Sequence, residues 1–427
     1  MNPGWPGPLV LFPATVGAQL DGFGSTWGWF DLKVDDLEQV VLIAKFWNKE
    51  SMGLPYVSSW QERHYLHYAD AVPRSGVWYR CDPELHVMHM YLYARGGGTA
   101  PAEIRSRIKG GWIQPPVDRP FLVMVLSRTE HDPVWSAWWV SRESAWPARF
   151  EIVDDRQQPV DFIRDVWPVE ELARVLVTIV GVGSIGGAAA EALASNAVGH
   201  IALVDPDRLL QRNLVRHKLS DTELGRFKVR AMSDHLETRY PHIQTESYPL
   251  DVVSDADVMR PLFARSDVIL CASDGVTSRR VANHLARRAG VPIVLAAVLE
   301  DGAFGEIIRV RRRTGCLLCL RKGLQEGGVL DPEPGIDLGY GTGTRHRPMT
   351  AAPADLQLVG DVAAKAAIAS MLEARGRWSQ RLPGDWGIIG LQPRPDTPEP
   401  FDVERAGEVR WRDLPRSRDD CPTCARP

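Results

Sequence analysis

The sequence has no long hydrophobic run and no marked excess of charge of either sign. No apolar stretch in its 427 residues approaches the roughly 18 residues that a membrane-spanning helix needs. The N-terminal segment MNPGWPGPLVLF lacks the basic start of a signal peptide. A formal net charge of −4 gives no overall attraction to nucleic acid or to anionic membranes. We therefore expect a cytoplasmic protein whose main partner is neither of these.

Cysteine is also scarce, with six residues in the chain. Cys81 and Cys271 are isolated, and the second is expected to be a small core residue. The other four form two Cys-x-x-Cys pairs: Cys316, Cys319, Cys421 and Cys424. In a reducing compartment such pairs favour a metal over disulfides, and four thiolates indicate a structural zinc site with no open position. Zinc would hold the tail to the preceding domain; a redox dithiol is the alternative.

Tryptophan is distributed unevenly, and this suggests two domains. Eleven of the fifteen tryptophans precede residue 150, after which helices and strands alternate regularly. We place an α+β partner-recognition domain at 1–150 and a second domain at 151–427.

The second domain has the pattern of a parallel, Rossmann-like α/β sheet. Strands are expected at 175–180, 200–204, 246–250, 267–271 and 291–297, and helices at 186–197, 222–239, 277–289 and 355–375. A mobile loop rich in glycine, proline and charge is expected at 323–350, and a proline-rich, zinc-bound tail at 380–427.

A glycine turn, GVGSIGG, follows the first of these strands and opens a helix of small residues. Glycines in this place let backbone N–H groups approach the phosphates of a nucleotide at a positive helix end. Polar residues then follow in a fixed order, and a hydride-transferring enzyme has no need of most of them. The ordered residues of the turn and its sequel are Gly181, Gly183, Ser184, Gly186, Asp205, Asp207, Asn213, Arg216, Lys228 and Asp274.

This order of motifs, with the C-terminal cysteines, resembles the ThiF/HesA/MoeB superfamily, which includes the adenylation domain of ubiquitin-activating enzymes. The resemblance covers about 156–375 and implies ATP and Mg²⁺ as cofactors. It implies that Gly183 and Gly186 face the phosphates and that Asp205 holds the ribose hydroxyls.

The same resemblance implies the residues that carry the chemistry. Asn213, Arg216 and Lys228 would grip the triphosphate, Asp274 would hold Mg²⁺, and Arg279 would support that loop. Taken singly, a lysine such as Lys228 is usually a solvated surface charge, and an aspartate such as Asp274 could simply cap a helix. Their joint order favours the nucleotide site.

Asp155-Arg156-Gln157 resembles the family's Arg-Gln pair, whose arginine reaches the ATP site of the other subunit. The resemblance therefore implies a homodimer with Arg156 acting in trans. A turn with a surface arginine is the alternative reading, and Arg164 is a competing candidate.

The expected loop lacks the cysteine that thiol-transferring members of the family carry before the next helix. Thr350 stands about where that cysteine would be. The enzyme would then stop at the acyl-adenylate and pass it to another protein. An oxyester on Thr350 or a remote thioester on Cys81 is the bolder alternative, and Cys81 is more simply a structural residue.

Residues 84–140 faintly resemble the core of a JAB/MPN domain, in which a strand carries His-x-His. The pattern is broken here, so the resemblance implies a degenerate, non-catalytic recognition domain. A conjugating-enzyme-like α+β domain is the competitor. His86 and His89 are expected to be structural rather than metal ligands.

These observations predict an ATP- and Mg²⁺-dependent adenylyltransferase that activates the C-terminal glycine of a ubiquitin-like or sulfur-carrier protein. The alternatives are a nicotinamide-dependent oxidoreductase, adenylation of a small carboxylate or a modified tRNA base, and a non-catalytic scaffold. A conjugating-enzyme-like acceptor is a possible second partner. The absence of a basic tail counts against tRNA.

Overall fold

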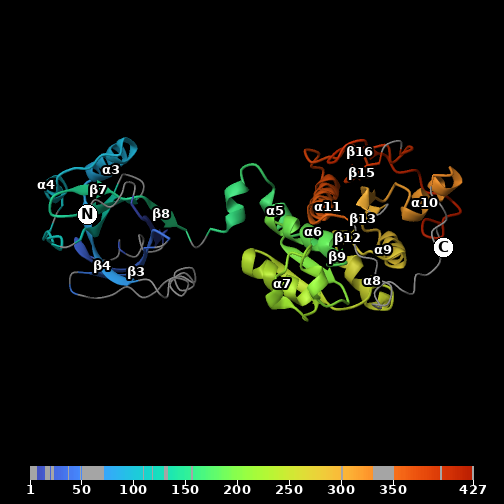
Figure 1. Ribbon diagram of the computed structural model, residues 1–427, viewed down its shortest axis with the longest axis horizontal. Coiled ribbons are helices and arrows are strands. Elements are labelled where there is room, and N and C mark those ends of the chain that lie inside the picture. The colour runs from blue at the N-terminus through green and yellow to red at the C-terminus, as the bar shows by residue number, and fades with distance from the viewer. Residues whose placement is uncertain are drawn as a thin grey trace. The chain divides into compact units, whose positions relative to one another are not determined.

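The computed structural model divides the chain into two compact units, Met1–Gln157 and Gln158–Pro427 (Figure 1). The structure describes residues 7–14, 20, 24–36, 38–48, 50, 72–108, 110–117, 119–128, 133–154, 157–299, 302–329, 351–394 and 397–425. Among the helices of these ranges, none is long and apolar enough to span a membrane.

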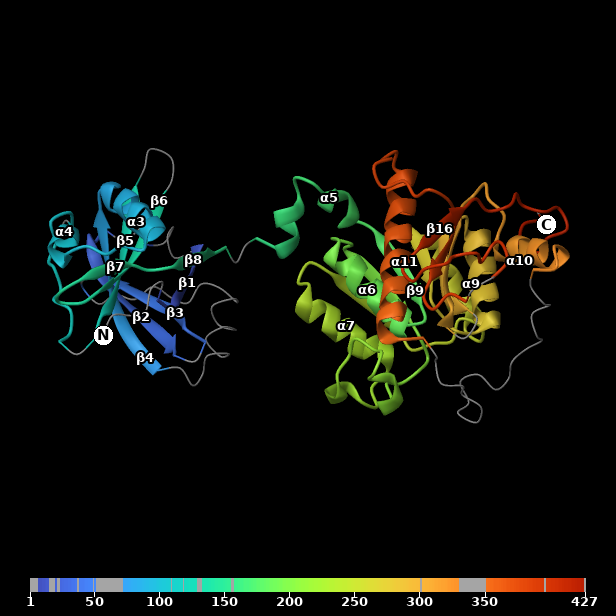
Figure 2. The ribbon, with the colours of Figure 1, turned by 45° about the horizontal axis from the view of Figure 1, so that its top comes forward.

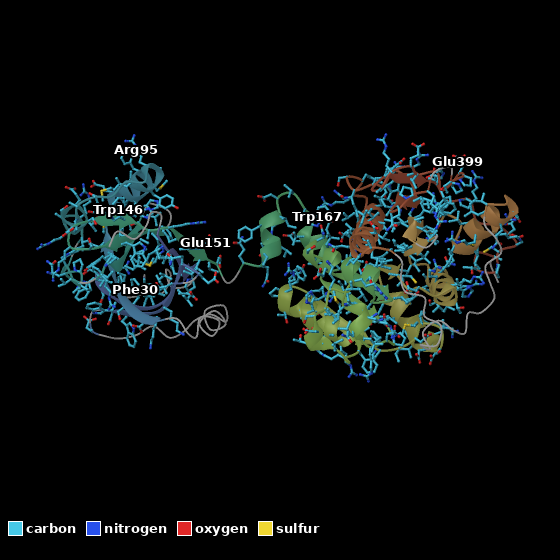
Figure 3. All side chains as sticks on the ribbon, in the orientation of Figure 1. Phe30, Arg95, Trp146, Glu151, Trp167 and Glu399 are labelled. Carbon is cyan, nitrogen blue, oxygen red and sulfur yellow. The ribbon has the colours of Figure 1, made fainter. Side chains whose placement is uncertain are left out.

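The first unit is built on a mixed eight-stranded sheet with the order β7-β6-β5-β4-β2-β3-β1-β8. Its strands are β1 (Leu9–Pro13), β2 (Trp27–Asp35), β3 (Val40–Asn48), β4 (Val72–Cys81), β5 (Phe121–Arg128), β6 (Pro133–Val140), β7 (Ala145–Pro147) and β8 (Phe150–Val153). The sheet curls (Figure 1), and Phe30 lies within the curl (Figure 3). Phe30 and Trp78 belong to the same buried hydrophobic cluster. Helices α3 (Glu84–Arg95) and α4 (Pro101–Arg105) cover the other face, through Leu85 and Ile104.

Helix α3 corrects the faint resemblance to a JAB/MPN domain. The segment that would have been the strand carrying His-x-His is a helix, which buries Leu85 and His89 four residues apart on one face. The structure therefore does not support that resemblance.

His86 and His89 both bond to backbone carbonyls of the first unit. His86 Nδ1 lies 2.8 Å from the carbonyl oxygen of Trp135, and His89 Nε2 lies 3.1 Å from that of Ala148. Burial lowers the pKa of His89 to about 4, although the bond to Ala148 opposes the shift. Within the described residues, neither histidine belongs to a group able to hold a metal.

The second unit is also built on an eight-stranded sheet, with the order β11-β10-β9-β12-β13-β14-β15-β16 (Figure 2). Its strands are β9 (Leu176–Val180), β10 (His200–Val204), β11 (Gln244–Tyr248), β12 (Val268–Cys271), β13 (Ile293–Leu299), β14 (Phe304–Val310), β15 (Trp386–Gly390) and β16 (Val409–Arg412). The first five are parallel and the last three are antiparallel. Strand order reverses between β9 and β12, and ligands of such sheets bind at that switch point.

Helices cover both faces of this sheet (Figure 2). The helices of this unit are η1 (Pro159–Ile163), α5 (Val169–Leu172), α6 (Ser184–Ser195), η2 (Gln211–Asn213), η3 (Asp221–Glu223), α7 (Lys228–Arg239), α8 (Ala256–Arg265), α9 (Val276–Ala289), α10 (Leu317–Glu326) and α11 (Pro353–Ala374). Helices α6, α7 and α11 pack on one face, and α8, α9 and α10 on the other. The expected α/β architecture of this unit is confirmed.

The structure differs from the sequence-based expectation in several places. Helix α7 begins at Lys228 rather than at residue 222, and α8 and β14 were not among the expected elements. Helix α10 continues through Glu326, so the expected loop cannot begin at residue 323. Residues 330–350, with the rest of that loop and Thr350, lie outside the described residues. The proline-rich tail contributes two strands: β15 pairs with the sheet edge formed by β14, and β16 pairs with β15.

Candidate functional site

A cavity of about 560 Å³ opens at the carboxyl ends of β9, β10 and β12. This is the edge of the sheet beside the switch point, where the first turns of α6 and α9 begin. Nine of the ten residues that the sequence assigns to the nucleotide line it: Gly181, Gly183, Ser184, Asp205, Asp207, Asn213, Arg216, Lys228 and Asp274. Residues spread over about ninety positions of the chain are thus brought to one place.

The positions of this turn require glycine for different physical reasons. Gly181 has a φ of +88°, a left-handed conformation that strains other residues. A Cβ on Gly186 would lie 1.8 Å from the carbonyl oxygen of Gly181, so Gly186 packs inside the turn. It does not line the cavity, which corrects the expectation that it faces the phosphates. A Cβ on Gly183 would meet no heavy atom within 4 Å and would stand in open space.

Asp205 ties the glycine turn to the end of β10. Its Oδ2 accepts a hydrogen bond from Val182 N at 2.7 Å, and its Oδ1 accepts one from Asp207 N at 2.8 Å. Burial raises the pKa of this carboxyl group, while nearby Lys228 and the two N–H donors oppose the shift. Each carboxylate oxygen can accept a further hydrogen bond, so Asp205 keeps acceptor capacity for a ligand.

Lys228, the first residue of α7, is buried against the cavity wall. Its Nζ donates to Asp207 Oδ2 at 2.8 Å, and the side chain of Asp207 is itself 59% exposed. A buried ammonium with one exposed partner can exchange that partner for another anion at little desolvation cost. This geometry suits a cation that meets phosphate.

Asn213 and Arg216 belong to the segment between β10 and α7, which lines part of the cavity. Asn213 Oδ1 accepts a hydrogen bond from Leu210 N at 2.9 Å, which fixes the turn η2. Both residues line the cavity, as do two further arginines, Arg208 and Arg212, that the sequence analysis did not single out. Arg208 is held by the carbonyl oxygen of Gly225 and by the ring of Phe227.

Two helix N-termini point at the cavity. Gly183 is the N-cap of α6 and Gly275 is the N-cap of α9, and both line the cavity. The positive ends of two helix dipoles therefore face the same space, which favours an anion there. Asp274 precedes Gly275 and is an exposed carboxylate at this position. A carboxylate beside a phosphate site is the protein ligand that Mg²⁺ commonly takes.

His217 is a residue that sequence reasoning missed. Its Nε2 lies 2.8 Å from the carbonyl oxygen of Val182, and its Nδ1 accepts a hydrogen bond from Leu219 N at 3.3 Å. Burial lowers the pKa of His217 to about 4, and the nearby charges of Lys228 and Arg216 contribute to the shift. The imidazole is therefore neutral at pH 7 and carries its proton on Nε2. The available signal was its place directly after Arg216.

Two of the arginines considered lie away from this cavity. Arg164 pairs with Asp161 and Glu170 at the surface of the second unit. Arg279 is half-buried on α9, outside the cavity lining, and its Nε is buried without a hydrogen-bond partner among the described residues. Arg156 lies outside the described residues.

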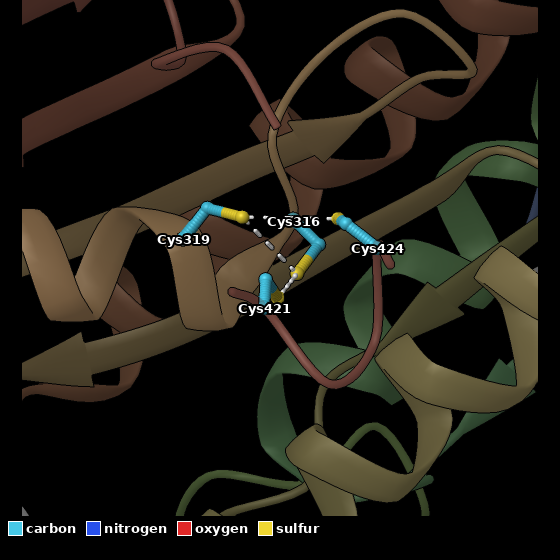
Figure 4. Close-up of side chains that lie close together, drawn as sticks. All are labelled: Cys316, Cys319, Cys421 and Cys424. Carbon is cyan, nitrogen blue, oxygen red and sulfur yellow. Dashed lines mark hydrogen bonds between the residues drawn. The ribbon is translucent and has the colours of Figure 1, made fainter. Parts of the chain in front are cut away.

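The four paired cysteines come together although about a hundred residues separate the pairs (Figure 4). Their sulfur atoms all lie within 4.8 Å of one another. Three of the S···S distances are 3.9, 3.6 and 3.7 Å. Zn–S bonds of about 2.3 Å in a tetrahedron place sulfurs about 3.8 Å apart, so the cluster fits a tetrathiolate metal site. Among the described residues, no other cluster of three or more His, Cys, Asp or Glu side chains could hold a metal.

The remaining cysteines are buried in their own units. Cys271 is fully buried at the end of β12, and burial raises the pKa of its thiol. Cys81 is 9% exposed at the end of β4. Both positions agree with structural roles.

Comparison with known proteins matches residues 155–350 to the ThiF family. The molybdopterin-synthase adenylyltransferases of Salmonella typhimurium and Escherichia coli are 31% and 32% identical over 168 residues, which are 39% of this chain and 67% of each relative. The sulfur carrier protein adenylyltransferase of Thermus thermophilus is 31% identical over 137 residues, 31% of this chain and 49% of the relative. Among solved structures, Escherichia coli MccB with ATP is 18% identical, with a TM-score of 0.45, over 60% of this chain and 68% of that chain. That likeness is too distant to say what this chain does.

Proposed function

This chain belongs to the ThiF family and is an adenylyltransferase, and from that premise we propose that it adenylates the C-terminal glycine carboxylate of a ubiquitin-like or sulfur-carrier protein. The observation that carries the proposal is the single cavity that gathers glycine turn, cations and carboxylates at the switch point of the sheet. The names of the relatives support the substrate class, since one is a sulfur carrier protein adenylyltransferase.

The reaction joins the partner's carboxylate to the α-phosphate of ATP. A carboxylate oxygen attacks the α-phosphorus, the bond to the bridging oxygen of pyrophosphate breaks, and the acyl-adenylate and pyrophosphate are the products. Negative charge gathers on the phosphate oxygens during this step, so catalysis depends on fixed positive groups around them.

We assign the charge-stabilising role to Asn213, Arg216 and Lys228. Lys228 exchanges Asp207 for the phosphates, because its ammonium is buried beside an exposed carboxylate. Arg216 and the Asn213 amide supply N–H donors from the segment between β10 and α7. A guanidinium matches phosphate oxygens in a bidentate way, so it both binds and orients them.

The glycine turn and Asp205 place the rest of the nucleotide. The space beside Gly183 lets the backbone and the N-termini of α6 and α9 approach the phosphates. Asp205 accepts hydrogen bonds from the ribose hydroxyls. Its carboxylate oxygens can accept these bonds in addition to those from Val182 N and Asp207 N.

Asp274 is the proposed protein ligand of Mg²⁺. Held there, Mg²⁺ would neutralise negative charge on the phosphates, including the charge that develops on the pyrophosphate. Asp274 lies beside Gly275 at the start of α9 and lines the cavity. The same cavity is lined by the residues that we propose donate hydrogen bonds to the phosphates.

We further propose a homodimer in which Arg156 reaches the partner's cavity, as the family resemblance implies. A pair of variants tests this proposal, Arg156→Ala and Asp274→Ala. In a mixed dimer, the Arg156→Ala chain keeps its Asp274 and receives Arg156 from the other chain, so one site is intact. Recovery of activity on mixing supports action in trans, and no recovery argues against it.

The N-terminal unit is proposed to bind the partner that receives the activated protein. Handing the acyl-adenylate to another protein needs no acceptor residue in this chain. Cys81 is an unfavourable acceptor, because it is 9% exposed and reactive thiolates need access.

Zinc is the metal we propose for the cysteine cluster. Four thiolates saturate its tetrahedral coordination, so the ion would be structural and would hold residues 421–424 against the start of α10.

ATP–pyrophosphate exchange tests the proposed function. The assay uses a small glycine-ended protein encoded by a neighbouring gene, with the full chain as enzyme. Controls are the Asp274→Ala enzyme and the partner protein lacking its final glycine. Exchange that disappears in both controls supports C-terminal adenylation. Exchange that persists without the protein but needs a small carboxylate or tRNA favours the alternative substrates, and ATP binding without any exchange favours a scaffold.

A further inference from the structure

Asn283 is a fully buried polar residue in the middle of α9. Its Oδ1 accepts a hydrogen bond from Leu317 N at 3.2 Å. Leu317 is the first residue of α10 and follows Cys316 directly, so Asn283 binds the backbone of the first cysteine pair. This contact also decides the orientation of the amide, because only its oxygen can accept from an N–H group.

The other half of the amide has no partner of its own. Asn283 Nδ2 is buried and makes no hydrogen bond with any described residue. Because Oδ1 and Nδ2 belong to one amide group, Nδ2 lies close to the backbone that joins Cys316 to Leu317. A buried N–H donor without a partner costs about 1–3 kcal/mol, so its retention calls for an acceptor.

A metal-bound thiolate is such an acceptor. A thiol that coordinates a metal loses its proton, and its sulfur then carries charge that N–H donors stabilise. Asparagine supplies such a donor without adding a second charge to a buried site. Groups that bond to metal ligands in this way orient them and tune the metal.

We propose that Asn283 Nδ2 donates an N–H···S hydrogen bond to the metal-bound thiolate of Cys316, which makes Asn283 a positioning residue of the metal site. The inference rests on the proposed zinc site and goes beyond its four ligands. The neighbouring residue, His284, also contacts the second cysteine pair, through Thr423 Oγ1 at 3.2 Å from its Nδ1. Both pairs are thus held by consecutive residues of one helix.

Asn283→Asp is the sharpest test, because it keeps the shape and the oxygen that binds Leu317 N but replaces the N–H donor. We expect metal affinity, measured by competition with a chelator, to fall about 10–100-fold. In the Co²⁺-loaded protein the thiolate-to-metal charge-transfer bands should also shift. Asn283→Ala should behave similarly. Thr423→Val is the matched control, since it removes a hydrogen bond between α9 and a cysteine pair without removing a donor to sulfur.

The wild-type protein supplies a readout that needs no variant. Loaded with NMR-active cadmium, it should show scalar coupling between the metal and an Asn283 Hδ2 proton across the N–H···S bond. Absence of that coupling, or unchanged affinity and spectra in Asn283→Asp, overturns the inference while leaving the zinc site intact. Wild-type protein that binds no metal overturns both.

Discussion

The imidazole of His217 and the carbonyl oxygen of Val182 lie 2.8 Å apart, while the N–H of the same Val182 is held by Asp205 at 2.7 Å. The two peptide groups that flank Val182 in the glycine turn are therefore fixed by side chains from two other segments. The backbone N–H groups of the turn are oriented before any ligand arrives, which is the preorganisation that charge stabilisation requires.

The stability of the second unit should fall when the pH drops below 6.5, because of His217. Its pKa in the fold is about 4 and its ordinary value is 6.5, so between these values the unfolded chain binds more protons. The linkage amounts to about 2 kcal/mol lost between pH 7.5 and pH 5. Urea unfolding at the two pH values should show this loss for the wild type and a smaller one for His217→Gln. Equal losses would assign the pH dependence to other groups.

Replacement of Lys228 should remove activity while leaving the fold intact. We expect Lys228→Met to lower pyrophosphate exchange by about 100-fold or more, because a fixed cation opposite developing charge is lost. Lys218→Met is the matched control: Lys218 is half-buried and pairs with Glu191 at 3.1 Å, outside the cavity lining. Similar rates in the two variants would place the chemistry elsewhere.

Replacement by alanine should affect stability at one glycine of the turn and nucleotide binding at another. Gly186→Ala should destabilise the second unit by about 1–3 kcal/mol, because its Cβ would overlap the carbonyl oxygen of Gly181 at 1.8 Å. Gly183→Ala should leave stability nearly unchanged and weaken ATP binding, since its Cβ enters open space. Thermal unfolding and a nucleotide-binding titration separate the two effects. A destabilised Gly183→Ala that binds ATP normally would contradict this division of roles.

Loss of one cysteine ligand should release the metal and loosen the tail. Cys421→Ser is expected to contain no zinc and to unfold at a lower temperature, because metal binding contributes to folding free energy. Cys81→Ser, which lies in the other unit, should keep its zinc. Metal analysis of the purified proteins, followed by calorimetry, makes the comparison, and zinc retained in Cys421→Ser would exclude the four-thiolate site.

A buried ion-pair network should be needed to connect α11 to the antiparallel strands. Arg309 is 1% exposed, and its guanidinium donates to Glu373 at 2.9 Å and to Asp385 at 2.8 Å. Arg309→Met would leave the buried carboxylates of Glu373 and Asp385 with only the partly exposed Arg311 as a cationic partner among the described residues, so we expect a loss of up to about 3–5 kcal/mol in the free energy of unfolding. Arg418→Met, which breaks a more exposed pair with Glu326, should cost no more than about 1 kcal/mol. Chemical unfolding would reveal whether the two costs are alike.

The parallel half of the sheet was predictable because its strands are short apolar runs bounded by glycine and charge. Strand β10 has the predicted ends, His200 and Val204, and β9 differs by one residue. Both are buried on two faces, so their sequence needs no polar alternation.

The antiparallel half was not predictable from local sequence. Strand β15, Trp386–Gly390, begins in a proline-rich tail and contains two glycines, which have low strand propensity. It is a strand because β14 offers it a paired edge and because the ion pairs of Arg309 hold its start. These contacts join residues that lie about eighty positions apart.

The sequence predicted the cavity residues that belong to a recognisable motif. It missed a residue whose role depends on a contact with a distant part of the chain. His217 bonds to a peptide 35 positions away, and no local pattern announces that contact. Asn283 is similar, because its importance depends on a cysteine cluster that only the folded chain assembles.

The contact between Cys316 and Cys421 has a consequence for folding during synthesis. Cys421 lies 105 positions after Cys316, and this length of chain must be synthesised before the second pair can meet the first, a delay of about 5–20 seconds at ordinary rates of translation. Until then the early pair is an incomplete chelate, although β15 and β16 have already been synthesised. Capture of the proposed zinc ion would therefore mark the moment at which the chain has been made through Cys424.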